Sequence, residues 1–209
     1  WTRLRPAEAK SATPWLATEE DDSVFASGDF TKNDTYKLKF ARVPKGTRTV
    51  RLEVLPDERL PANGPGRVSY EGPEGDFFLS KIKVRADGRE IKITGSGQSF
   101  AAGGNTAEKA IDDDLQSGWS INGGQGRAHD AVFHLAESVE GEVEIDLVCE
   151  RYYAAGIGRF RIWVNGAENS PAPSAVNDAF LAMLKNDDDA RKKVFAHFLK
   201  VTPELLSAR

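Results

Sequence analysis

Apolar and polar residues alternate along most of the first 166 residues, and this alternation constrains the fold more than any other feature. One apolar phase runs through Tyr36, Leu38 and Phe40, and a longer one covers residues 143–149. A strand with this period buries one face and exposes the other, as in antiparallel sheets packed face to face. The pattern recurs in shorter runs at 50–54, 82–84, 91–93, 131–135 and 160–164.

Turn-forming residues separate these runs. They lie at 44–46, 63–66, Gly123-Gly124 and Gly141, and Asp87-Gly88 is typical of a tight hairpin between two strands. Eight or more short strands with such spacing predict an all-β fold, namely an antiparallel jelly-roll β-sandwich.

The pattern changes after Asn165-Gly166. Residues 170–174 have the sequence Ser-Pro-Ala-Pro-Ser of a linker, and apolar residues then recur at helical spacing up to residue 199. We therefore expect a β-sandwich domain over residues 1–168, followed by a linker and a short helical tail over residues 169–209.

Composition excludes several classes of function. The net charge of −4 and the even spread of basic residues give no stripe for binding nucleic acid. No apolar run reaches the ~20 residues of a membrane span. Cys149 is the only cysteine and lies in the apolar phase of a strand, so we expect a buried, unreactive thiol. Covalent c-type haem is excluded because there is no Cys-x-x-Cys-His motif.

Residues 109–119 form the most chemically distinctive segment, Lys-Ala-Ile-Asp-Asp-Asp-Leu-Gln-Ser-Gly-Trp. Calcium takes six to eight oxygen ligands at about 2.3–2.6 Å, and Asp112 and Asp114 can converge in a tight turn. An EF-hand is excluded, since Ser117 and Gly123 stand where that motif needs glycine and glutamate. A metal-free turn rich in aspartate is the alternative.

This segment resembles the calcium turn of discoidin-like and galactose-binding-like domains. The resemblance implies that Lys109 supplies a carbonyl oxygen, that Asp112 and Asp114 supply carboxylates, and that Ser117 supplies a further oxygen. It also places Trp119 in the core. Calcium is therefore the cofactor that the resemblance implies for this chain.

Residues 77–84 are similar to the strand that brings a glutamate to the metal in the same family. Here this strand precedes the acidic turn instead of following it, which implies a circularly permuted sandwich. Lys81 stands where the family has the glutamate. Its ammonium group among Asp112 and Asp114 could replace the ion, and the two alternatives stay open at this point.

A broader resemblance covers nearly the whole chain. Blocks at 22–28, 51–57, 60–67, 110–119, 128–133 and 158–162 look like a region of large secreted planctomycete proteins that carry a c-type cytochrome domain. The resemblance implies an extracytoplasmic location, periplasmic or secreted, within a larger protein. It also implies neighbouring domains of the parent chain as partners and a setting rich in polysaccharide.

Two glycine-rich loops suggest a sugar site. Arg67 ends Gly-Pro-Gly-Arg, and Arg159 ends Gly-Ile-Gly-Arg, and each guanidinium offers a planar fork to hydroxyls or anions. Tyr152 provides a stacking face, and His129 at the entrance of a strand could face the ligand. The alternatives are ion pairs from the arginines to Asp57, Glu58 or Asp76, and a surface position for His129.

No nucleophile with a neighbouring base, nucleophile elbow or phosphate loop is recognisable. The sequence therefore predicts a non-catalytic, carbohydrate-binding-like accessory module that holds a polysaccharide or other glycan through loops at one end of the sandwich. The alternative is a structural or docking domain that orients neighbouring haem and other domains without a ligand. That the chain is a hydrolase is the least supported hypothesis.

Overall fold

The computed structural model describes residues 1–172, 188, 189, 191 and 192. Within them the chain is mostly antiparallel β-sheet, which confirms the all-β class. Almost all of the helical tail predicted within residues 169–209 lies outside the described residues. None of the described residues belongs to a helix that is long and apolar enough to cross a membrane.

Residues 1–172 contain ten strands and two short 3₁₀ helices. They are β1 (Thr2–Leu4), β2 (Glu8–Lys10), β3 (Trp15–Thr18), β4 (Val24–Ser27), β5 (Asn33–Val54), η1 (Pro61–Asn63), β6 (Lys81–Ala86), β7 (Arg89–Ile91), β8 (Ile93–Gln98), η2 (Ala107–Ala110), β9 (His129–Glu150) and β10 (Arg159–Asn165).

The strands β5 and β9 are each 22 residues long and pair with one another along most of their length. Register shifts between Phe40 and Thr49 mark a sharp bend in this pair, and Gly46 and Gly141 there have positive φ. The turns predicted at 44–46 and at Gly141 are therefore bends inside continuous strands. The prediction of short strands throughout is wrong for these two.

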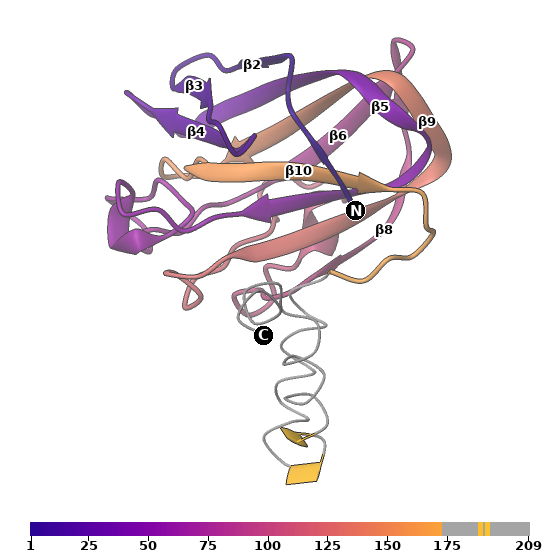
Figure 1. Ribbon diagram of the computed structural model, residues 1–209. Coiled ribbons are helices and arrows are strands. Elements are labelled where there is room, and N and C mark those ends of the chain that lie inside the picture. The colour runs from indigo at the N-terminus through magenta and orange to yellow at the C-terminus, as the bar shows by residue number, and fades with distance from the viewer. Residues whose placement is uncertain (173–187, 190, 193–209) are drawn as a thin grey trace.

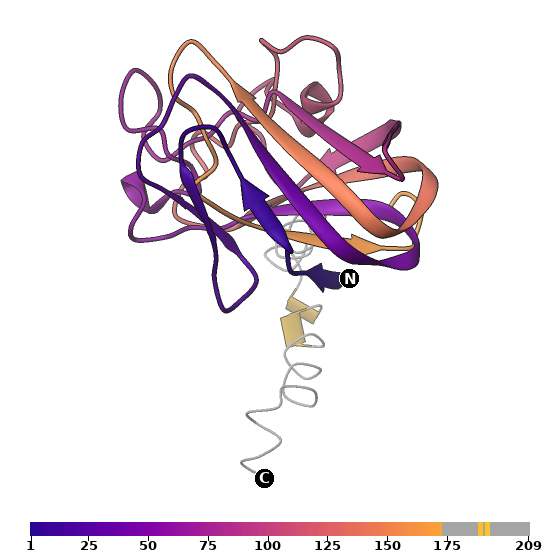
Figure 2. The same cartoon turned by 90° about the horizontal axis from the view of Figure 1, so that it is seen from above.

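The bend folds the sheet back on itself (Figures 1 and 2). The first half of β5 and the second half of β9 pair with β2 and β6, and β7 extends this layer. The second half of β5 pairs with β10, and the first half of β9 pairs with β8. Both ends of both long strands consequently lie at the same end of the molecule.

The apolar phase of each strand faces the space between these layers, as the alternation predicts. Tyr36 from the first layer stacks on Phe160 from the second, with ring centroids 6.0 Å apart. Cys149 is buried in the same core, and burial raises the pKa of its thiol to about 12. The buried position expected for this thiol from the sequence is confirmed.

The hairpin predicted at Asp87-Gly88 is confirmed. β6 and β7 pair with Val84 opposite Ile91 and Ala86 opposite Arg89. Asp87 and Gly88 both have positive φ, 51° and 73°. Two consecutive left-handed residues are the requirement of the type I′ turn, which matches the natural twist of the strands.

Long connections follow from the two bent strands. Because β5 and β9 begin and end at one end of the molecule, the segments 28–32, 55–80, 99–128 and 151–158 all gather there (left side of Figure 1). These loops surround the candidate site.

Candidate ligand-binding site

A cavity of about 410 Å³ opens between four of these loop segments, 73–78, 102–105, 120–122 and 151–153. The segments are distant in sequence and meet only because the bent strands return to the same end. Ligand sites are concave and carry a few convergent polar groups, and this cavity has both features.

The loops are held together by backbone pairing beside Trp119. Leu79 and Trp119 exchange two N–H···O hydrogen bonds of 2.9 Å each. The indole of Trp119 is fully buried, donates to the carbonyl of Phe100 at 2.9 Å and meets the edge of Phe77 at 5.0 Å. The position in the core that the resemblance implied for Trp119 is therefore the one observed.

Asp76 forms a buried support of the cavity. Its carboxylate accepts hydrogen bonds from the Ser120 hydroxyl at 2.6 Å and from the Ile121 backbone at 2.9 Å. Burial raises the pKa of Asp76 above its ordinary value, while these hydrogen bonds act in the opposite direction. The carboxylate thus ties the segment 73–78 to the segment 120–122.

Two tyrosines stand on one side of the cavity. Tyr153 is buried and packs so closely on Gly72 that a Cβ there would lie 2.5 Å from its ring. Burial raises the pKa of the Tyr153 hydroxyl. Tyr152 meets Tyr153 edge to face at 4.8 Å and is 65% exposed. An exposed ring held by a buried neighbour offers a firm stacking face.

Arg151 lies between the aromatic rings and the acidic turn. Its guanidinium carbon is 4.1 Å from the centre of the Phe78 ring and 5.3 Å from that of Tyr152. One terminal nitrogen donates to the carbonyl of Gln116 at 2.8 Å. The buried Nε has no hydrogen-bond partner among the described residues. The stacking fixes the guanidinium beside the cavity.

Two asparagines complete the polar lining. Asn105 and Asn122 line the cavity, and neither side-chain amide makes a hydrogen bond to another described residue. Each amide both donates and accepts hydrogen bonds. Together with the ring of Tyr152, they form a site suited to a ligand that has an apolar face and several hydroxyl groups.

Among the ligand-binding residues predicted from the sequence, only Tyr152 lines this cavity. Arg159 forms ion pairs with Glu19 at 3.2 Å, Asp21 at 3.0 Å and Asp57 at 3.1 Å. The loop-bracing alternative thus describes Arg159. Arg59 also donates hydrogen bonds to both carboxylate oxygens of Asp57. Arg59 above all, together with Arg159, lowers the pKa of Asp57 to about 2.

The side chains of Arg67 and His129 also make contacts that hold the fold together. Arg67 is 8% exposed and donates to the backbone carbonyls of Gly28 and Asp29, so it pairs with none of the three carboxylates considered. His129 is 1% exposed, with Nε2 2.7 Å from the carbonyl oxygen of Gly124 and its ring against Phe100. The prediction of a surface position for His129 is wrong, because the loop at Gly124 covers the start of β9.

The acidic turn brings several oxygens together at Ser117. The Ser117 hydroxyl lies 2.7 and 2.9 Å from the two carboxylate oxygens of Asp112, 3.0 Å from the carbonyl of Asp114 and 3.3 Å from that of Lys109. The carboxylate of Asp114 instead accepts the backbone N–H of Gln116 at 2.9 Å. Asp114 therefore contributes its carbonyl, where the resemblance implied its carboxylate.

Lys81 lies beside this turn, but its ammonium group pairs with Asp113 at 2.9 Å and not with Asp112 or Asp114. Lys109 Nζ is 3.6 Å from Asp112. Within the described part of the chain, no three His, Cys, Asp or Glu side chains form a group that could hold a metal ion. The oxygens at Ser117 are of the kinds that calcium takes, with a single carboxylate among them.

The sequence did not identify Asn105, Asn122 or Arg151 as candidate site residues, and it suggested Asp76 only as an ion-pair partner for an arginine. The asparagines flank Gly103-Gly104 and Gly123-Gly124, which marks them as turn residues and gives no indication that the two turns meet. Only the bend of β5 and β9 brings them to one cavity.

Comparison of the chain with protein-family models, with curated proteins and with solved structures finds no match in any of the three. Inference of function therefore starts from the sequence and from the geometry of the cavity.

Proposed function

We propose that this chain is a non-catalytic, carbohydrate-binding-like module of a larger extracytoplasmic protein, and that it holds a glycan in the cavity beside Tyr152. The observation that carries the proposal is that the exposed Tyr152 lines one cavity with two asparagines whose side-chain amides make no hydrogen bond to another described residue. Neighbouring domains of the parent chain are the further partners that we propose.

The physical basis is the amphipathic character of sugars. One face of a pyranose ring presents C–H groups that pack on an aromatic ring, and its edge presents hydroxyls. The amides of Asn105 and Asn122 match hydroxyls because each amide donates and accepts. A cavity of about 410 Å³ is within the usual range for small-molecule sites.

We further propose that the folded sheet is a circularly permuted jelly-roll sandwich of the galactose-binding-like type. Support comes from the segment 77–84, which lies beside the acidic turn through the pairing of Leu79 with Trp119 and the ion pair of Lys81 with Asp113. The resemblance of the two segments implied this proximity.

Calcium binding at the acidic turn is part of the proposal. Asp112 would supply its carboxylate, Lys109 and Asp114 their carbonyls and Ser117 its hydroxyl, with water completing the shell. One carboxylate gives a weak site, in the range of about 10⁻⁴–10⁻³ M known for extracellular modules. Its role is to stiffen the loop that carries Gln116, the hydrogen-bond partner of Arg151.

A glycan array that includes neutral and sulfated polysaccharides, followed by calorimetry on the ligands found, tests the proposal. Tyr152→Ala is expected to weaken binding about tenfold or more, which is about 1.4 kcal/mol. Trp15→Ala is the matched control, because Trp15 is 74% exposed and does not line the cavity. Silence across the whole panel would contradict the proposal.

A structural or docking domain is the second candidate function. Trp15, Phe30 and Tyr70 are at least half exposed and lie outside the cavity, and exposed aromatic side chains are typical of protein interfaces. In that case Trp15→Ala or Tyr70→Ala weakens association with a neighbouring domain of the parent protein, whereas Tyr152→Ala affects it less.

A further inference from the structure

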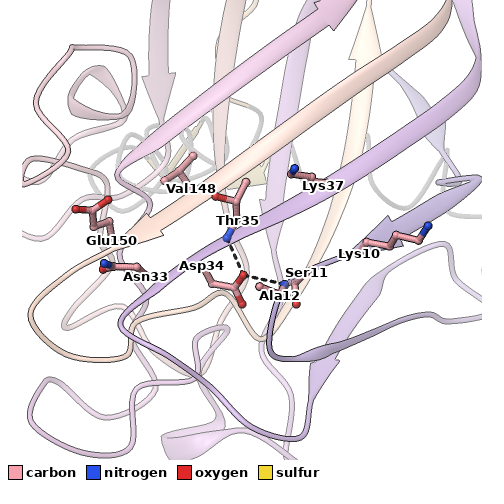
Figure 3. Close-up of a pocket in the computed structure, with 9 residues that line it drawn as sticks. All are labelled: Lys10, Ser11, Ala12, Asn33, Asp34, Thr35, Lys37, Val148 and Glu150. Atoms are coloured by element: carbon pink, nitrogen blue, oxygen red, sulfur yellow. Dashed lines mark hydrogen bonds between the residues drawn. The ribbon is translucent and has the colours of Figure 1, made fainter.

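A second cavity, of about 480 Å³, lies where β5 begins and β9 ends (Figure 3). Its lining comes from three places in the chain, namely residues 10–12, the start of β5 and the end of β9. None of these residues belongs to the cavity beside Tyr152.

Asp34 lies at the edge of this cavity, on the core-facing side of β5. The side chain is 8% exposed, and Oδ1 accepts hydrogen bonds from the backbone of Thr35 at 2.7 Å and of Ala12 at 3.3 Å (Figure 3). Oδ2 is buried and has no hydrogen-bond partner among the described residues. Through Oδ1 the carboxylate ties the start of β5 to residues 10–12, which line the cavity.

Further polar residues line the cavity, and their side chains have no partner among the described residues. The side chains of Asn33, Lys37 and Glu150 line it, and no described residue forms a hydrogen bond or ion pair with any of them. The lining carries two positive charges, from Lys10 and Lys37, and two negative charges, from Asp34 and Glu150. A lining with balanced charge, rich in both donors and acceptors, suits an uncharged ligand with hydroxyl groups.

The residues that line the two cavities are consecutive in sequence at the end of β9. Glu150 lines the second cavity, and the next residues, Arg151 and Tyr152, line the first. Asn33 stands opposite Glu150 in the sheet, and the Arg151 backbone donates to the carbonyl of Lys32 at 3.1 Å. The first cavity is balanced in charge as well, since its lining holds Arg151 and Asp76.

We propose that the cavity at the start of β5 is a second subsite for the same glycan, and that the ligand is an extended, uncharged oligosaccharide that passes over the end of β9. This proposal rests on the proposed function. It adds a chain-length requirement and a preference for neutral sugars, neither of which follows from the cavity beside Tyr152 alone.

Calorimetry with neutral gluco-, xylo-, manno- and galacto-oligosaccharides, each from the disaccharide to the hexasaccharide, tests the proposal. Affinity is expected to rise about tenfold or more between the disaccharide and the hexasaccharide of the preferred series. The double variant Asn33→Ala/Lys37→Ala is expected to lose that gain and to keep the disaccharide affinity. Lys39→Ala is the matched control, because Lys39 lies on the same strand face and pairs with Glu144 outside the cavity.

Three results overturn the inference and leave the proposed function standing: an affinity independent of chain length, a gain that survives in the double variant, or tighter binding of sulfated or uronate oligosaccharides. In each of them the wild type still binds sugar and Tyr152→Ala still weakens it. Absence of binding to every member of the panel overturns the inference and the proposed function together.

Discussion

Tyr36 stacks on Phe160 across the core, with the ring planes 20° apart, and its hydroxyl donates to the carbonyl of Ile157 at 3.0 Å. Ile157 belongs to the loop that also carries Tyr152. Gly156 lies so close to the same hydroxyl that a Cβ there would be 2.5 Å from it. One side chain of the core thus fixes the loop that bears the exposed aromatic ring.

Removal of the Tyr36 hydroxyl tests this connection. Tyr36→Phe is expected to lower the free energy of unfolding by about 1–3 kcal/mol, because the buried carbonyl of Ile157 loses its donor. Urea denaturation measures the change. Tyr70→Phe, at a ring that is 74% exposed, is the control and should stay within about 0.5 kcal/mol. Equal stability of both variants would contradict the role of the hydroxyl.

The thiol of Cys149 is expected to be unreactive in the folded protein. Burial raises its pKa to about 12, so almost no thiolate exists near neutral pH, and the residue as a whole is only 2% exposed. Alkylation followed by mass spectrometry should show modification only after addition of denaturant. Fast labelling of the native chain would show that the end of β9 opens.

Asp57 should make the fold sensitive to acid. Its pKa is lowered to about 2 in the folded protein, chiefly by Arg59, against 3.8 for the free side chain. The protonated form is therefore disfavoured on folding, so the contribution is complete above pH 3.8 and is lost as pH falls toward 2. Unfolding followed against pH should show this loss, and Asp57→Asn should flatten that part of the curve. Asp29→Asn, at an exposed position, should leave it unchanged.

The sequence predicts the strands well because alternation reports burial directly. Tyr36, Leu38 and Phe40 face the core as predicted, and so do Ile82 and Val84. The bends of β5 and β9 could not be predicted in the same way. Gly46 and Gly141 indicate a change of direction, but the same residues suit a break between two strands. Which of the two occurs depends on pairing across the sheet.

The site was less predictable than the fold. An arginine in a glycine-rich loop has the same sequence signature whether it binds a ligand or braces the loop, and the neighbours of Arg159 decide the matter. His129 follows a polar stretch that suggests exposure, yet Phe100 and the loop at Gly124 cover it. Tyr152 alone among the predicted ligand-binding residues lines the cavity.

Calcium is expected to stabilise the acidic turn. At a calcium concentration about ten times the dissociation constant, the gain is about 1.4 kcal/mol, and the melting temperature should rise accordingly. Chelator should reverse the rise, and Asp112→Asn should abolish it because the carboxylate that contacts the Ser117 hydroxyl is lost. Asp113→Asn is the control, since Asp113 pairs with Lys81. No change in melting temperature with calcium would contradict the metal site.

Titration of the isotope-labelled protein with the preferred neutral oligosaccharide, followed by two-dimensional NMR, tests the central claim most directly. The account predicts concentration-dependent shifts of the side-chain amides of Asn105 and Asn122 and of the backbone at Tyr152, with His129 and Arg159 little affected. Shifts confined to the surface around Trp15, or no shifts at any oligosaccharide concentration, would contradict it.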